Sequence, residues 1–116
     1  MEKPISKETR IVLLSSLKKG HFDKDTVKYI YGEIRDYMDR YSYKANLIKI
    51  ERCLHDSIEL DREMKLAILS VLKKGYFGEQ DSLLIRGKMD EKINVGSQDE
   101  LKQCAFDLLD ALAEDD

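Results

Sequence analysis

Leu14-Ser15-Ser16-Leu17-Lys18-Lys19-Gly20-His21-Phe22 is the stretch that decides the fold, because a close copy of it returns later in the chain. The copy is Leu69-Ser70-Val71-Leu72-Lys73-Lys74-Gly75-Tyr76-Phe77, which lies 55 residues further on and is identical at seven of nine positions. The same offset pairs Gly32 with Gly87. Agreement of this kind over an ungapped stretch predicts an internal duplication.

Helical spacing of apolar residues, together with helix-capping residues, predicts six helices. We expect them at about residues 7–19, 24–40, 43–56, 62–74, 79–92 and 98–113. No segment rich in alternating Val, Ile and Thr competes as a strand, so no sheet is expected. The predicted fold class is all-α, a compact bundle of about six helices formed by two tandem copies of a three-helix unit. The copies fall at about 6–57 and 61–112 of a single helical domain that spans 1–116.

The ends of the expected helices carry clear signals. Short polar residues that can accept a hydrogen bond from a first-turn amide are predicted N-caps; they are Ser6, Asp23, Ser42, Asp61 and Ser97. Gly20 and Gly75 each follow a Lys-Lys pair, and glycine just past a helix supplies the left-handed residue that ends it. We therefore predict a positive φ at both glycines.

Apolar stripes predict which helix faces point inward. In the first helix we expect Ile11, Leu14 and Leu17 to be buried. Helix 62–74 is apolar nearly all round, which predicts a central, enclosed helix. Helix 98–113 carries a long stripe, so it and helix 62–74 are expected to hold the most buried positions; the stripe is Leu101, Cys104, Ala105, Leu108, Leu109 and Leu112.

Composition favours a globular, cytoplasmic protein. Hydrophobic residues make up 42% of the chain and charged residues 37%, which is too apolar for disorder and suits helices with charged outer faces. No apolar run is long enough to cross a bilayer, and no signal peptide is recognisable, so no membrane contact is expected. Cys53 and Cys104 are expected to be small buried side chains and not a disulfide.

No set of residues in the sequence amounts to a catalytic, cofactor or metal site. The only histidines are His21 and His55, and the repeat replaces His21 by Tyr76. There is no P-loop, no dinucleotide fingerprint and no zinc-ligand spacing. We therefore expect a protein that is not an enzyme and that uses no cofactor and no metal.

The unusual surface feature is a group of tyrosines flanked by arginine on the expected helix 24–40. Tyrosine and arginine are enriched in protein interfaces, and one helix cannot bury every ring. The predicted partner-binding residues are Tyr29, Tyr31, Arg35 and Tyr37. The predicted function is a small regulatory or accessory module that binds a protein partner.

Charge asymmetry supports an alternative, which is nucleic-acid binding by the first half of the chain. Residues 1–55 carry 12 basic and 8 acidic side chains, whereas residues 56–116 carry 8 basic and 15 acidic ones. The cations that would serve nucleic acid are Lys18, Lys19, Lys24, Lys28, Arg35 and Arg40. The repeated turn offers another basic surface, made by Lys18, Lys19, Lys73 and Lys74. Homo-oligomerisation stays open at this point.

Overall fold

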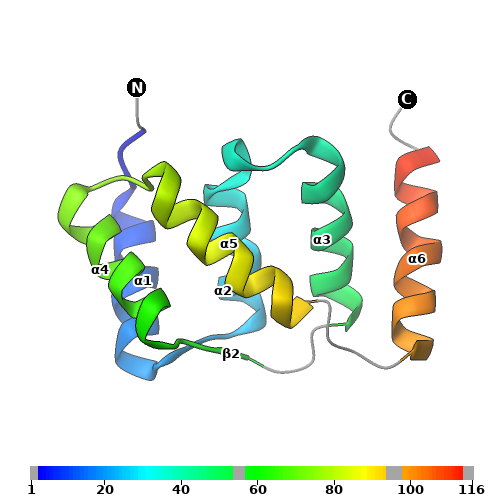
Figure 1. Ribbon diagram of the computed structural model, residues 1–116, viewed down its shortest axis with the longest axis horizontal. Coiled ribbons are helices and arrows are strands. Elements are labelled where there is room, and N and C mark those ends of the chain that lie inside the picture. The colour runs from blue at the N-terminus through cyan, green and yellow to red at the C-terminus, as the bar shows by residue number, and fades with distance from the viewer. Residues whose placement is uncertain (1–2, 54–56, 94–97, 114–116) are drawn as a thin grey trace.

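The chain is mostly helical, with two helices at one end of the molecule and the last helix at the other (Figure 1). The computed structural model describes residues 3–53, 57–93 and 98–113. The elements in chain order are α1 (Lys7–Lys19), β1 (His21–Phe22), α2 (Lys24–Glu33), η1 (Arg35–Tyr37), α3 (Arg40–Cys53), β2 (Ile58–Glu59), α4 (Arg62–Lys74), α5 (Glu79–Ile93) and α6 (Gln98–Ala113). The expectation of a mostly helical, compact bundle is confirmed, with principal extents of 40 × 30 × 21 Å.

Helices α1 and α4 begin and end where their capping residues predict. Ser6 Oγ accepts a hydrogen bond from the backbone N–H of Thr9 at 3.1 Å, and the side chain of Asp61 caps α4 in the same way. Gly20 has a φ of 83° and Gly75 a φ of 85°, so the prediction of two left-handed glycines is confirmed. Each glycine donates its N–H to a carbonyl one turn back at 2.8 Å, which closes the last helical turn.

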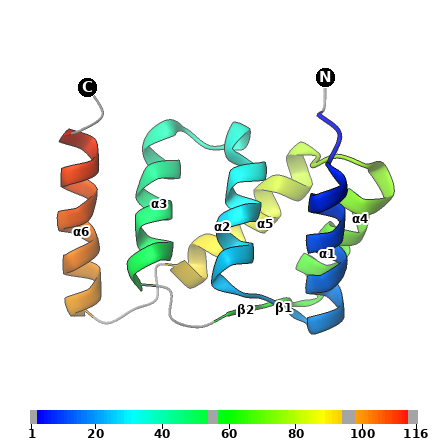
Figure 2. The same ribbon diagram turned by 180° about the vertical axis from the view of Figure 1, so that it is seen from behind.

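A short antiparallel ladder joins the segment after α1 to the segment before α4. β1 pairs with β2, with His21 opposite Glu59 and Phe22 opposite Ile58 (Figure 2). The expectation that the chain has no sheet is therefore wrong in this detail. Each strand has only two residues, which is too short for an alternating apolar pattern to reveal it in the sequence.

The opposite end of the α1/α4 pair carries an equivalent crossing. Here the segment before α1 meets the segment after α4. The Ile5 N–H donates to the Gly75 carbonyl at 2.8 Å, and the Leu60 N–H donates to the Gly20 carbonyl at 3.0 Å. Ile5 and Leu60 are 55 residues apart, as are Gly20 and Gly75. The two hydrogen bonds are therefore equivalent: in each, the residue before one helix donates to the glycine that ends the other helix. The two crossings make α1 and α4 run antiparallel.

The segment after α2 departs from the prediction. We expected one helix over 24–40, but α2 ends at Glu33 and the 3₁₀ turn η1 separates it from α3. The N-cap of α3 is also different, because the Asp39 carboxylate accepts hydrogen bonds from the Ser42 N–H at 2.7 Å and from the Ser42 hydroxyl at 2.9 Å. Ser42 is thus inside the first turn, and α3 begins earlier than expected.

The third helices of the two expected repeats have different neighbours. α3 packs on α2 and α5, whereas α6 packs mainly on α3 (Figures 1 and 2). The expected match of α3 with α6 in one common three-helix arrangement is therefore not seen. The second helices also differ, because α5 packs closely on α4 whereas α2 makes little contact with α1, so the observed parallel between the halves is confined to the capped ends of α1 and α4.

The buried faces of the helices also differ from the prediction. The buried residues of α1 are Thr9, Leu13 and Ser16, while the expected Ile11 and Leu14 are exposed. The expectation of an enclosed α4 is wrong, because Met64, Ala67, Ile68 and Val71 are buried but Leu66 and Leu69 are exposed.

Helix α6 is less buried than expected. Ala105, Phe106 and Leu109 are exposed, so α6 has fewer buried side chains than α4 among the described residues. The expectations for the side chains of Cys53, Leu101, Cys104 and Leu112, and those for His55 and the Ser97 cap, fall outside the described part of the chain. The core lies instead between α2, α4 and α5, around Phe22, Tyr31 and Ile68.

Candidate partner-binding surface

The tyrosines predicted to bind a partner do not form an outward face. The Tyr31 side chain is fully buried, so its expected place on the outer face of the helix is wrong. Its hydroxyl donates to the Asp90 carboxylate, and Asn46 Nδ2 donates to the same carboxylate at 2.9 Å. Tyr31 therefore belongs to the packing between α2, α3 and α5.

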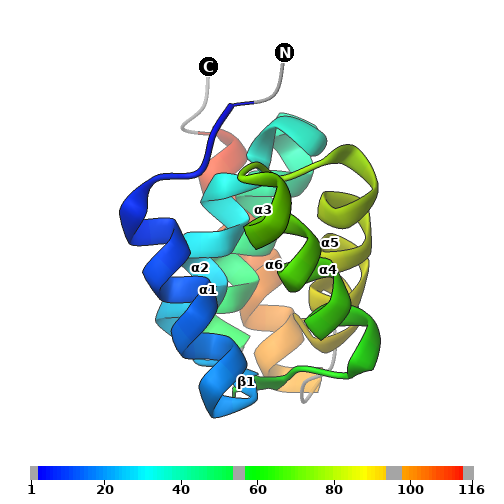
Figure 3. The same cartoon turned by 90° about the vertical axis from the view of Figure 1, so that its left-hand side faces the viewer.

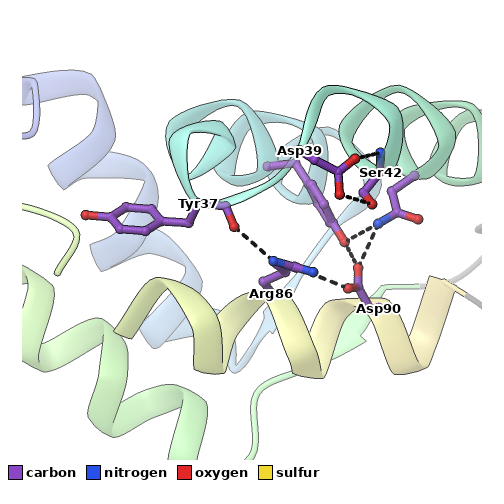
Figure 4. A network of polar contacts seen from close by, with 7 residues as sticks. Tyr37, Asp39, Ser42, Arg86 and Asp90 are labelled. Atoms are coloured by element: carbon purple, nitrogen blue, oxygen red, sulfur yellow. Dashed lines mark hydrogen bonds and ion pairs between the residues drawn. The ribbon is translucent and has the colours of Figure 1, made fainter. Parts of the chain in front are cut away.

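The hydrogen bonds of Tyr31 and Asn46 to Asp90 belong to a polar network that joins α2, α3 and α5, in which Figure 4 labels Arg86 and Asp90. Arg86 Nε lies 3.6 Å from Asp90 Oδ2, and the Arg86 guanidinium also donates to the Tyr37 carbonyl at 2.9 Å. Burial raises the pKa of the Asp90 carboxyl above its ordinary value. Because the Tyr31 hydroxyl, the Asp90 carboxylate and the Arg86 guanidinium all contact partners of the same chain, the network fixes α5 against the end of α2.

The other three residues of the tyrosine group are divided between the core and the surface. Tyr29 is half-buried and its hydroxyl lies 2.9 Å from Thr9 Oγ1. Tyr37 is half-buried and donates to the Phe77 carbonyl at 3.1 Å. Arg35 is exposed. The four residues thus offer a partner one exposed side chain, and their binding role stays a prediction.

The basic residues of the repeated turn are partly engaged. Lys19 lies 3.9 Å from Asp23, and Lys74 lies 3.3 Å from Asp81. Lys18 and Lys73 are exposed, and each sits at the end of an exposed stripe on its helix. The Nζ atoms of Lys24 and Lys28, which belong to the nucleic-acid alternative, both reach Glu51, at its carbonyl and its carboxylate respectively.

An exposed apolar surface that the sequence interpretation placed in the core lies on the outer side of α1 and α4. The exposed fractions are 56% for Ile11, 52% for Leu14, 56% for Leu66 and 51% for Leu69. These residues stand on the side of each helix opposite its buried stripe. Figure 3 shows α1 and α4 side by side at this end of the molecule, with α5 flanking α4 and with α2, α3 and α6 behind.

Basic residues border the apolar centre of this surface. Along each helix the exposed residues follow one line at helical spacing, with a cation at each end of an aliphatic pair. We call the following set the α1/α4 face: Lys7, Ile11, Leu14 and Lys18 from α1, with Arg62, Leu66, Leu69 and Lys73 from α4. Arg10 also donates to the Leu72 carbonyl at 3.3 Å, which ties the two helices together.

The α1/α4 face has the chemistry of a recognition surface. Its two lines occupy equivalent positions 55 residues apart, and each presents aliphatic side chains to solvent. A contiguous exposed apolar patch with a polar border is typical of an interaction site, whereas single exposed leucines are ordinary. The signal was present in the sequence, because α1 and α4 carry apolar residues on two opposite sides.

Comparison of the chain with protein-family models, curated proteins and solved structures finds no match. Among residues 3–53, 57–93 and 98–113, no helix combines the length and apolar character that a bilayer crossing requires. Within the same residues, no group of three or more His, Cys, Asp or Glu is placed to hold a metal ion. The function is therefore argued from the surface itself.

Proposed function

We propose that this protein is a small non-enzymatic interaction module that binds a protein partner through the α1/α4 face. The observation that carries the proposal is the exposure of Ile11, Leu14, Leu66 and Leu69 on the side of the helix pair that faces away from the core. Covering aliphatic surface that water otherwise touches is favourable, at roughly 25 cal/mol per Å². A partner that buries this face gains that free energy, whereas folding of the chain alone does not.

The composition of the face favours protein over nucleic acid as the partner. Its centre is aliphatic, and aliphatic side chains offer neither hydrogen bonds for base edges nor planar surfaces for base stacking. Two adjacent helices with apolar residues at i and i+3 suit an amphipathic helix laid across them. The bordering lysines and arginine would then select acidic side chains on that helix.

Nucleic-acid binding is the second candidate, and the excess of cations on α1 and α4 supports it. The two helices hold eight basic and two acidic side chains. Phosphate contacts would use those cations without the aliphatic centre. The candidates therefore differ in which substitutions should abolish binding.

We further propose that the α1/α4 face contains two equivalent lines of residues because the chain arose by tandem duplication, with copies at about 6–57 and 61–112. The paired caps, the paired left-handed glycines and the exchanged hydrogen bonds at Gly20 and Gly75 support this. A contact between the start of the first helix and the end of the second also recurs. Thr9 donates to Glu33 at 2.8 Å in the first half, and Lys88 Nζ lies 2.9 Å from Asp61 in the second. On this proposal the third helices later diverged in packing.

The same proposal places the protein in the cytoplasm as a regulatory or accessory component. Support comes from the sequence, which has only two cysteines and in which 37% of the residues are charged, as suits a reducing, aqueous compartment. No catalytic role is proposed, because the polar clusters described above are engaged in holding helices together.

The test is affinity capture from the native host with identification by mass spectrometry, with and without nuclease. The binding variant carries Leu14→Ser and Leu69→Ser, and the control carries Tyr41→Ser, which removes an equally exposed side chain from α3. We expect the binding variant to lose a protein that wild type and control retain after nuclease. Loss of all captured protein after nuclease would refute protein binding and favour nucleic acid. Equal capture by all three proteins would refute the α1/α4 face.

A further inference from the structure

A second exposed apolar surface lies on α6, at the opposite end of the molecule from α1 and α4 (Figure 1). Phe106 is 64% exposed and Leu109 is 63% exposed, which are the largest exposed fractions among the bulky apolar side chains described. They stand three residues apart on one side of α6, and Asp99, Lys102 and Asp110 are exposed on the same side. We call these five residues the α6 face. Because α6 packs on α3 with its other side, this face points away from the body.

The two exposed surfaces carry opposite charge. Helices α1 and α4 together hold eight basic and two acidic side chains. Helix α6 holds four acidic side chains and one basic side chain, Lys102. One end of the protein is therefore apolar and basic, and the other end is apolar and acidic.

Charge decides which of these surfaces can meet between two copies of the chain. Two α1/α4 faces placed together would oppose Lys18 and Lys73 to their own copies, and two α6 faces would oppose carboxylates to carboxylates. Like charges brought together at an interface are costly, whereas unlike charges fix the register and speed association. The pairing that joins apolar centres and complementary borders is one α1/α4 face with one α6 face.

We propose that this chain assembles head to tail, with the α6 face of one copy docked across the α1/α4 face of the next. This inference rests on the proposed function, because it uses the same face and names a second copy as its partner. Phe106 and Leu109 supply the i and i+3 anchors of an amphipathic helix, and α1 and α4 supply the pair of helices that receives it. Asp99 and Asp110 approach the cations that border the aliphatic centre.

The geometry lets the assembly grow beyond two copies, into a ring or an open filament. A docking that uses different surfaces on the two copies leaves one free surface of each kind, so a further copy can add at either end. The two faces lie at opposite ends of the 40 Å axis, which keeps each copy from satisfying its own α1/α4 face.

The size of the α1/α4 face sets the expected strength. A 13-residue helix is about 20 Å long, and two such helices side by side are about 20 Å wide, so the face covers roughly 400 Å². Stable interfaces bury about 800 Å² per partner. We therefore expect weak, concentration-dependent association that grows weaker with salt, because its charged border is solvent-exposed.

Sedimentation velocity of the purified full chain over a wide concentration range tests the proposal. Wild type should form a growing series of oligomers at high concentration, and higher salt should dissociate them. Leu14→Ser with Leu69→Ser removes one surface, and Phe106→Ser with Leu109→Ser removes the other. Each variant alone should associate at least about tenfold more weakly than wild type, since it lacks two interface anchors.

Mixing the two variants gives the decisive measurement, because each keeps the surface that the other lacks. An equimolar mixture should form a 1:1 complex that grows no further. A Tyr41→Ser chain should assemble like wild type. A variant pair that stays monomeric when mixed, although wild type associates, would overturn the head-to-tail geometry.

A charge exchange keeps the test independent of the apolar substitutions and of any effect they have on folding. Lys18→Glu with Lys73→Glu should weaken assembly, as should Asp99→Lys with Asp110→Lys, and a chain carrying all four should recover it. Failure to recover would count against the docking.

The outcomes separate this inference from the proposed function. Wild type that stays monomeric at every concentration overturns self-assembly, while host capture that depends on Leu14 and Leu69 would still support the proposed function. Assembly that survives loss of Leu14 and Leu69 overturns the head-to-tail inference, and host capture that is also unchanged would overturn the proposed function.

Discussion

Replacing Gly20 and Gly75 by alanine tests the left-handed ends of α1 and α4 with a magnitude that the structure defines. Their φ and ψ values are 83° and 12° for Gly20 and 85° and 12° for Gly75. A Cβ built on either glycine meets no heavy atom within 4 Å, so the substitution causes no collision. What remains is the cost of holding an L-residue in the left-handed region, about 1 kcal/mol per site.

Gly87 provides a matched control with the opposite expected sign. It lies within α5, its φ is not positive, and a Cβ there also meets nothing within 4 Å. Alanine at this position should stabilise the protein by roughly 0.5–1 kcal/mol, because it restricts the unfolded chain and favours the helix. The three substitutions therefore differ in backbone conformation and not in packing.

Thermal unfolding followed by circular dichroism measures these effects. An unfolding entropy of about 2.1 cal/mol/K per residue makes 1 kcal/mol equal to roughly 4 °C for 116 residues. Gly20→Ala and Gly75→Ala should each lower Tm by about 4 °C, and the double variant by about 8 °C, because the two glycines lie at opposite ends of the antiparallel helix pair. Gly87→Ala should raise Tm. A rise in Tm for either cap variant would refute the left-handed cap.

Three further outcomes follow from the structure. Leu13→Ala should cost about 2–5 kcal/mol in urea unfolding and Leu14→Ala under about 0.5 kcal/mol, since the first side chain is buried and the second exposed; equal costs would contradict the assigned faces. The backbone N–H bonds that Asp23 and Asp61 accept as N-caps lower the pKa values of both carboxyls below the unfolded values. The stability that the two charged caps contribute is therefore present above the unfolded pKa, near 3.9, and is lost as pH falls through the folded pKa. In measurements of Tm against pH, Asp→Asn at both sites should flatten the change in stability across that acid range and leave neutral stability nearly unchanged. Tyr31→Phe should cost about 1–3 kcal/mol in urea unfolding, because it leaves partners of the buried hydroxyl unsatisfied; no loss would show that the network contributes nothing.

Helix ends were predictable where the signals are local. The observed bounds of α1 and α4 equal the expected ones, because a cap bonds to an amide three residues away and a glycine ends the helix that precedes it. Such contacts lie within a few residues of each other and can be recognised in the sequence. They also supply most of the similarity between the two halves.

The break between α2 and α3 has one local signal, the Asp39 cap of α3, which our prediction from the sequence missed. It is stabilised by contacts from distant parts of the chain, namely the Tyr37 hydroxyl on the Phe77 carbonyl and Arg86 on the Tyr37 carbonyl. Before these contacts are known, residues 24–40 present an uninterrupted helical pattern. The burial of Tyr31 has the same origin, because its hydroxyl is satisfied by Asp90, 59 residues away.

The orientation of α1 about its own axis decides whether the candidate surface exists at all. Apolar residues alone favour burying Ile11 and Leu14, yet the chain buries Thr9 and Ser16 and leaves that pair in solvent. Burying Thr9 is tolerable because its hydroxyl is bonded to Tyr29 and Glu33, and the Ser16 hydroxyl is bonded to the Val12 carbonyl.

The crossings at both ends of the α1/α4 pair prevent the alternative orientation. Gly20 and Gly75 are each tied by their carbonyls to the other half of the chain, so neither helix can rotate to hide its aliphatic pair without breaking those hydrogen bonds. An exposed pair on one helix would carry little meaning. Here both helices carry such a pair, at positions 55 residues apart and with a cation at each end. The fold keeps both pairs exposed. A partner that covers these side chains removes their apolar surface from water, which is a favourable free energy that folding alone does not gain. The functional proposal therefore rests on their exposure and not on the tyrosine group.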